Sequence, residues 1–260
     1  MKRSTTALTL IAALLATGGM VWQSQPANAA EAGAELMTKS WQHDGFFGTF
    51  DRSAAQRGLQ VYREVCSSCH GLKYVAFRNL AALGYTEDQI KAIAAESTIT
   101  DGPNDEGAMF DREGRPSDRF PSPFANEKEA AFINGGVAPP DLSVMTKARE
   151  GGANYVYSLL RGYEEPPPDI EVREGSYYNL YFPGHWISMP PPLYEDGVTY
   201  ADGTPATIEQ MASDVAVFLS WAAEPKLEER KQTGLKVMLF LITLTGLFYA
   251  TKRKVWTDAH

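Results

Sequence analysis

The sequence of 260 residues has little cysteine and histidine, with only two of the first and four of the second. Two cysteines cannot build a disulfide-stapled scaffold, a four-cysteine zinc site or an iron–sulfur cluster with four thiolate ligands. The sequence also lacks any convincing period-two strand run and any internal repeat, so helices are the expected elements. With 44% hydrophobic and 22% charged residues, the chain has the composition of a folded protein.

Positive charge is scarce in the middle of the chain. Residues 31–225 hold 15 Lys and Arg against 29 Asp and Glu, a net charge of −14, whereas residues 226–260 hold 7 against 3, a net charge of +4. The negative sign excludes a nucleic acid as partner. The excess of carboxylates either only keeps the protein soluble or attracts a basic partner, and attraction of that kind weakens as salt is added.

The N-terminal 30 residues have the composition of a secretory signal peptide. Lys2 and Arg3 precede an apolar stretch over residues 7–21, and an A-x-A site follows at residues 27–29. The apolar stretch is shorter than the ~20 residues of a spanning helix, which disfavours the alternative of an uncleaved membrane anchor. We expect cleavage after Ala29 or Ala30 and export of the mature protein.

The C-terminal end predicts a single transmembrane helix over residues 235–251. Residues 237–250 carry no charge, and the basic cluster of residues 252–254 follows at once. Basic residues next to a span remain on the cytoplasmic side of the membrane. The prediction is therefore an external domain over residues 31–225, a juxtamembrane segment over 226–234 and a cytoplasmic tail over 252–260. The alternative is that residues 235–251 form a helix buried in the protein core and do not span a membrane.

Three helices are predicted in the external domain. The first begins near Ser53 in a capping box with Gln56 and carries Cys66 and Cys69 on or beside its apolar face. The last begins with the capping box at Thr207 and ends at Glu224-Pro225, and a shorter one begins at Thr86. We expect the last helix to pack on the first near Gly58, where no side chain keeps the backbones apart.

Long turn-rich tracts separate these helices, over residues 101–123, 135–140, 164–169 and 189–192. Ordering each loop residue costs about 1 to 2 kcal/mol, so this much loop without a sheet needs a large group to wrap around. The sequence thus predicts a mainly α-helical domain whose long loops surround a bound cofactor.

Residues 66–70 read CSSCH, which is the attachment signature of c-type haem. Two thiols one helical turn apart add across the two vinyl groups, and His70 presents a ring nitrogen to the iron. A redox-active dithiol and a plain disulfide are the alternatives. A thioredoxin-type pair begins a helix after a strand, whereas Cys66 and Cys69 end a helix that no predicted strand precedes.

The sixth iron ligand distinguishes an electron carrier from gas or peroxide chemistry. Met189 is the preferred candidate, because it lies in an apolar loop before three prolines and has no helix to pack against. His185 and an open distal site are the alternatives. The other candidates are less suitable because of where they lie. Met145 and Met211 are expected to pack on a helix, and Met109 lies in a charged stretch exposed to solvent. Met37 and His43 lie upstream of the haem helix, Met238 lies in the span and His260 lies in the tail.

Several motifs together resemble the cytochrome c1 family, of bacterial type. They are residues 61–70 (VYREVCSSCH), 85–88 (YTED), 101–104 (DGPN), 139–143 (PPDLS), 181–184 (YFPG), 202–207 (DGTPAT) and 221–225 (WAAEP). The resemblance covers essentially the whole mature chain. It implies a c-type cytochrome fold with one covalent haem c, in which Cys66 and Cys69 form the thioethers, His70 is the proximal iron ligand and Met189 is the distal one.

The resemblance also implies a function. A haem domain in the periplasm, anchored in the bacterial inner membrane, would take an electron from a Rieske iron–sulfur subunit beside cytochrome b and pass it to a soluble cytochrome c, within a dimeric ubiquinol:cytochrome c oxidoreductase. No substrate turnover of its own is expected. Residues 130–134 lack the arginine that family members often carry before the Asn-Gly stretch. A peroxidase-like haem enzyme and an anchored carrier for another oxidase are the alternatives.

Overall fold

The computed structural model describes residues 34–168, 170, 171 and 173–257, so the predicted signal peptide and the last three residues lie outside it. Its helices are α1 (Arg52–Val61), the π-helical turn η1 (Tyr62–Cys66), the 3₁₀ helix η2 (Phe77–Leu83), α2 (Glu87–Ala95), α3 (Glu127–Ile133), α4 (Met145–Ala148), α5 (Ala153–Arg161), α6 (Ile208–Ala223) and α7 (Leu227–Thr257). The mainly helical prediction is confirmed.

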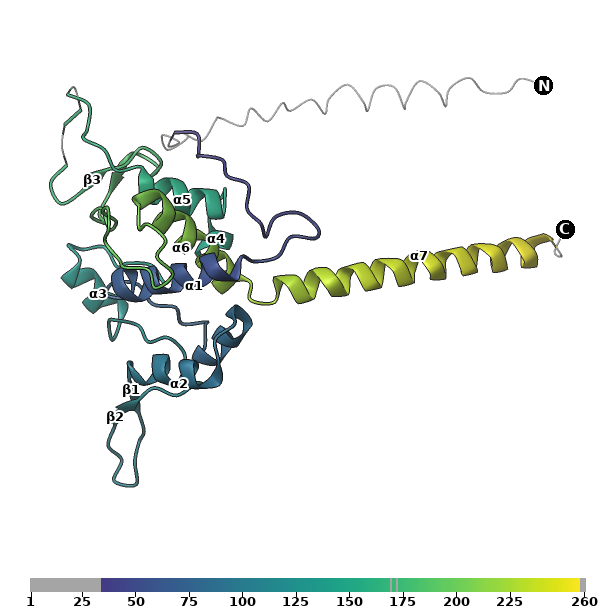
Figure 1. Cartoon of the computed structure of the whole chain (residues 1–260), viewed down its shortest axis with the longest axis horizontal. Helices are drawn as coiled ribbons and strands as arrows, with labels where there is room; N and C mark the ends of the chain where they lie inside the picture. Colours follow the sequence, from purple (N-terminus) through teal and green to yellow (C-terminus); the bar gives the residue numbers. More distant parts are fainter. Residues whose placement is uncertain (1–33, 169, 172, 258–260) are drawn as a thin grey trace, which may run out of the picture. The chain divides into compact units, whose positions relative to one another are not determined.

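The described residues also form two short antiparallel hairpins (Figure 1). One pairs β1 (Thr98–Asp101) with β2 (Phe110–Glu113), and the other pairs β3 (Tyr177–Tyr178) with β4 (Trp186–Ile187). Strands of two to four residues carry too little alternation to be found in the sequence.

The core is built on the packing of α1 against α6. An ideal Cβ placed on Gly58 would lie only 2.1 Å from the carbonyl oxygen of Asp214 and 2.7 Å from the Cβ of Phe218, so the two backbones approach as closely as glycine allows. Phe218 and Trp221 are at most 1% exposed. The predicted contact near Gly58 is confirmed, and it fixes the helix that leads into residues 66–70.

A buried ion pair joins the same two helices. The Arg57 Nε donates to the Asp214 Oδ2 at 2.8 Å, and the Asp214 side chain is 1% exposed. Arg57 also reaches Asp202, whose side chain is 46% exposed, at 2.9 Å. Because a buried carboxylate is costly without a partner, Asp214 ties the orientation of α6 to that of α1.

The helix starts are only partly as predicted. Thr207 caps α6 by accepting from the Gln210 N–H, and Thr86 forms its capping box with Gln89, as expected. The first helix begins at Arg52, near the predicted Ser53, but the predicted capping box at Ser53 is wrong, because the Asp51 carboxylate accepts from the Ala54 N–H and caps α1. A carboxylate also favours the positive end of the helix dipole.

The α7 helix is 31 residues long and extends the predicted span in both directions (Figure 1). It is the one helix among the described residues that is long and apolar enough to cross a membrane. None of its most apolar 18-residue window is buried against the rest of the chain, so it is not a core helix of the head.

Candidate haem site

A π-helical turn delivers the CSSCH residues from the end of α1. The Ser67 N–H donates to the Tyr62 carbonyl at 2.8 Å, which widens the helix by one residue. The N–H groups of Cys69 and His70 then both donate to the Cys66 carbonyl, at 3.1 and 2.9 Å. Turns of this kind are frequent at functional sites. They place both thiols and the His70 imidazole on one tight turn.

The His70 ring is oriented by a carbonyl far away in the sequence. Its Nδ1 lies 2.7 Å from the Pro140 oxygen, which can only accept, so Nδ1 carries the proton and Nε2 keeps its lone pair free. Burial lowers the pKa of His70, although the Pro140 contact and Asp141 oppose the shift, and the imidazole is neutral at pH 7. A neutral imidazole fixed through its second nitrogen is the donor that a haem iron requires.

The Pro140 segment is itself held against the chain that follows His70. The Leu142 N–H donates to the Gly71 carbonyl at 2.9 Å, and the Lys73 N–H donates to the Asp141 carboxylate at 2.8 Å. In the sequence, residues 139–143 stand out only as a family motif, and nothing local assigns them this role. Pro140, the partner of His70, is 70 residues away in the sequence, and only the pair of prolines at 139 and 140 distinguishes that segment.

Cys66 and Cys69 are both free, half-buried thiols. Burial raises the pKa of Cys66 to about 12, and Cys69 adds to the shift, so Cys66 stays protonated at neutral pH. A redox-active dithiol needs a stabilised thiolate, usually at a helix N-terminus, whereas the Cys66 thiol is protonated and ends a helical turn. The arrangement fits addition of two thiols to a porphyrin better than disulfide exchange.

Met189 lies on a separate segment, just after β4. Its side chain is half-buried, and the Tyr163 hydroxyl donates to its carbonyl at 3.1 Å, which fixes the start of the proline triplet. The competing ligand His185 lies on the same loop. Its Nδ1 lies 3.3 Å from the Asn179 carbonyl, and its ring stacks on Tyr178 at 5.5 Å between centroids. The carbonyl contact leaves Nε2 free, as it does in His70, so His185 stays the alternative to Met189.

Of the remaining candidates, Met211 and Met109 lie where the sequence suggests. Met211 is fully buried in α6, and Met109 is 59% exposed. His43, expected in an upstream arm, is instead 92% buried beside Phe50, because that arm packs on the head through a bond from the Trp41 Nε1 to Asn154 at 2.7 Å. Met238 is in α7, and His260 lies outside the described residues.

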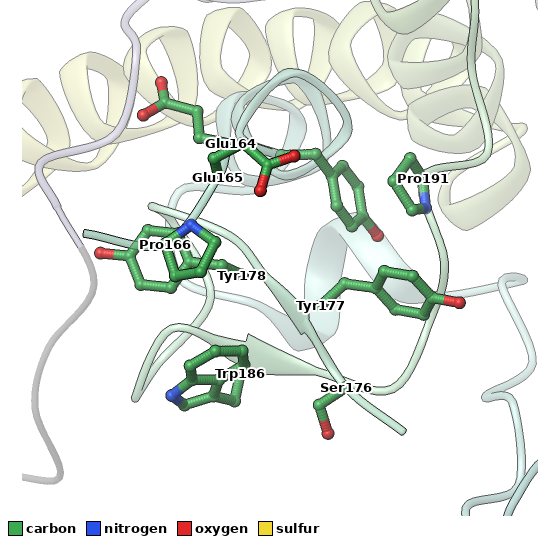
Figure 2. A pocket seen from close by; sticks show the side chains of 9 residues that line it. Glu164, Glu165, Pro166, Ser176, Tyr177, Tyr178, Trp186 and Pro191 are labelled. Carbon is green, nitrogen blue, oxygen red and sulfur yellow. The ribbon is translucent and has the colours of Figure 1, made fainter. Parts of the chain in front are cut away.

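A pocket lies beside the Met189 segment and is shown in Figure 2. Its volume is about 480 Å³, and its walls combine aromatic rings with the carboxylates of Glu164 and Glu165. Tyr163, which holds Met189, and Pro191 both line it. None of the four predicted haem residues lines this pocket, so we do not assign it to the haem.

Comparison with known proteins gives the family. A model of the Cytochrome C1 family matches residues 41–259. The chain belongs to the cytochrome c1 family. It is 51% identical to the cytochrome c1 of Rhodospirillum rubrum over 95% of this chain and 96% of that protein. It is also 51% identical to a mitochondrial cytochrome c1 heme protein of Arabidopsis thaliana, over 88% of this chain and 74% of that protein.

A third relative is a longer chain. The cytochrome b/c1 of Bradyrhizobium diazoefficiens is 51% identical over 95% of this chain, which corresponds to 39% of that longer protein. Membership of the cytochrome c1 family makes this chain a haem subunit of the cytochrome bc1 complex, with a role in respiratory electron transport. The resemblance seen in the sequence is confirmed at the level of family and fold.

Proposed function

We propose that the chain holds one haem c covalently through Cys66 and Cys69, with His70 as the proximal and Met189 as the distal iron ligand. The contact between the His70 Nδ1 and the Pro140 carbonyl carries this proposal, because it directs Nε2 away as a free donor. When bound, the haem supplies an iron centre that takes up and releases one electron.

The residues of the chain set the conditions for this chemistry. Pro140 fixes the tautomer and the plane of His70, and the Tyr62 hydroxyl donates to the His70 carbonyl at 2.9 Å, so the ligand turn is braced on two sides. Tyr163 holds the Met189 main chain. Ligands that do not move lower the cost of reorganisation when the charge at the iron changes, and thioether ligation favours a high potential.

The acidic surface suits the electron-transfer partners that we propose. The head takes an electron from a Rieske iron–sulfur protein and passes it to a soluble cytochrome c, beside cytochrome b in a dimeric complex. The net charge of −14 over residues 31–225 supports attraction of a basic acceptor. This steering would accelerate encounter at low salt and weaken as salt screens it.

We further propose the topology. Residues 1–30 are removed as a signal peptide, residues 31–225 form the haem domain in the periplasm, and residues 226–234 lead into the membrane. Residues 235–251 of α7 cross the inner membrane, and residues 252–260 remain in the cytoplasm. The exposed apolar surface of α7 and the basic cluster at residues 252–254 support this orientation.

Rapid-reaction measurements on the purified complex test this function. After a pulse of ubiquinol, the c-type haem should be reduced only while the Rieske centre is competent and should be reoxidised by added cytochrome c, at a rate that falls as salt rises. A variant with both Cys66→Ala and Cys69→Ala should hold no covalent haem, seen as haem extracted by acidic acetone, whereas Cys66→Ala alone should keep its haem in that solvent through Cys69. Reduction that does not depend on the Rieske protein would contradict the proposal, as would an acceptor rate that does not change with salt.

A further inference from the structure

The loop before α1 exposes an aromatic pair at its tip. Phe46 is 53% exposed and Phe47 is 79% exposed, and their rings meet edge to face with centroids 4.9 Å apart. The aromatic residues on either side, Trp41 and Phe50, are at most 6% exposed. The pair thus projects from a segment that is otherwise packed on the head.

The loop has a fixed conformation. The Asp44 N–H donates to the Trp41 carbonyl at 3.0 Å, and the Thr49 N–H donates to the Gln42 carbonyl at 3.1 Å, so the loop is closed at both ends. An ideal Cβ on Gly48 would lie 1.9 Å from the Asp44 oxygen, so this closure requires glycine. An aromatic pair that is already ordered loses little conformational freedom when it binds.

Three hydrogen bonds attach the loop to the first turns of α7. The Lys231 ammonium donates to the carbonyls of His43 and Gly48, at 2.7 and 3.1 Å, and the Phe50 N–H donates to the Glu228 carboxylate at 2.9 Å. In Figure 1 the loop, in purple, projects beside the beginning of α7. Lys231 therefore sets the position of the aromatic tip along the helix.

That position corresponds to the surface of a bilayer. Lys231 precedes the proposed span by four residues, which is about 6 Å at 1.5 Å per residue. The polar layer on each side of the hydrocarbon core is about 5 to 8 Å deep. The neighbouring Lys226 and Arg230 side chains pair with Glu229 and Glu224 but are still 83% and 62% exposed, and such exposed cations suit lipid phosphates.

We propose that Phe46 and Phe47 insert into the lipid headgroup layer on the head side of the membrane, so that the head has a second contact with the bilayer besides α7. Aromatic side chains are stable at this depth. Because α1 begins four residues after Gly48, at Arg52, the contact would restrict tilting of the head and keep the candidate haem turn at a constant height. The inference rests on the proposed membrane span of α7.

Nitroxide accessibility tests the insertion. The full-length, haem-loaded protein is placed in nanodiscs of phosphatidylethanolamine and phosphatidylglycerol, with one label per variant, at Phe47→Cys, Phe46→Cys, Phe240→Cys or Met109→Cys. Phe240 lies within the proposed span, and Met109, 59% exposed, precedes β2. Oxygen enters the apolar part of a bilayer, whereas a nickel chelate stays in water, so their relaxation effects report depth.

We expect the ratio of oxygen to nickel accessibility at residues 46 and 47 to be several-fold above that at residue 109 and to approach the ratio at residue 240. If both loop labels match residue 109, the tip lies in water and the inference is wrong. If they are shielded from both reagents, protein covers the tip and the inference is also wrong. If residue 240 itself matches residue 109, the proposed span is wrong, and the inference falls with it.

Discussion

The contact at Gly58 gives a stability prediction whose size follows from the structure. In Gly58→Ala the new Cβ would lie 2.1 Å from the Asp214 oxygen, whereas ordinary contact begins at 3.4 Å, so α6 must move by about 1.3 Å. Overpacking of this kind costs about 1 to 3 kcal/mol. Alanine returns about 1 kcal/mol of helix propensity, but the clash is with main chain, which has little room to adjust.

We therefore expect Gly58→Ala to lower the free energy of unfolding by about 1 to 2 kcal/mol, which lowers Tm by about 2 to 8 °C for a domain of this size. Thermal unfolding of the full-length, haem-loaded protein in detergent, followed by far-UV circular dichroism, measures the change. Gly234→Ala is the matched control, since a Cβ there meets nothing within 4 Å. A Gly58→Ala protein as stable as the wild type would refute the reasoning about the helix contact.

Two further predictions concern charged groups. Asp214→Ala removes the buried partner of Arg57 but leaves Asp202 in place, so it should cost about 1.5 to 3 kcal/mol in urea unfolding. Asp202→Ala removes only the exposed partner and should cost about 0 to 1 kcal/mol. Equal losses would contradict the assigned burial. Glu224 bonds Arg230 and, at 2.9 Å, Lys147, and the Arg230 bond in particular lowers the pKa of Glu224 below its ordinary 4.5. Its ionised form therefore stabilises the fold above pH 4.5. The wild type should have a higher free energy of unfolding than Glu224→Gln at pH 7, and the difference should disappear as pH falls below 4.5 through the folded pKa. A difference that does not depend on pH would contradict this pairing.

Local signals in the sequence were sufficient for several features. The spacing of Cys66, Cys69 and His70 is the spacing that covalent haem attachment needs. The apolar run before residue 252 indicates a helix whose surroundings are lipid. The caps at Thr207 and Thr86 depend on residues three apart, so the sequence alone predicts them. Asp51 and Ser53 are both good caps, and nothing local decides between them.

Long-range contacts could not be predicted in the same way. The bond between His70 and Pro140 joins segments 70 residues apart, and the partner is a main-chain carbonyl that every residue carries. Asp214 reads as one polar position on an apolar helix, and only the fold reveals that Arg57 reaches it. The small helices α3 and α5 were also missed, because α3 has seven residues and α5 begins after Gly152 without a side-chain cap.

The central claim is that His70 and Met189 ligate one haem in an electron carrier. A redox titration tests this claim most directly. The full-length protein and its Met189→Leu variant are both titrated, and each is exposed to carbon monoxide after reduction. We predict that the wild type is six-coordinate and low-spin and binds no carbon monoxide, while Met189→Leu has a much lower midpoint potential and binds it readily. An unchanged spectrum and midpoint in Met189→Leu would contradict the assignment of Met189, and carbon monoxide binding to the reduced wild type would contradict the electron-carrier role.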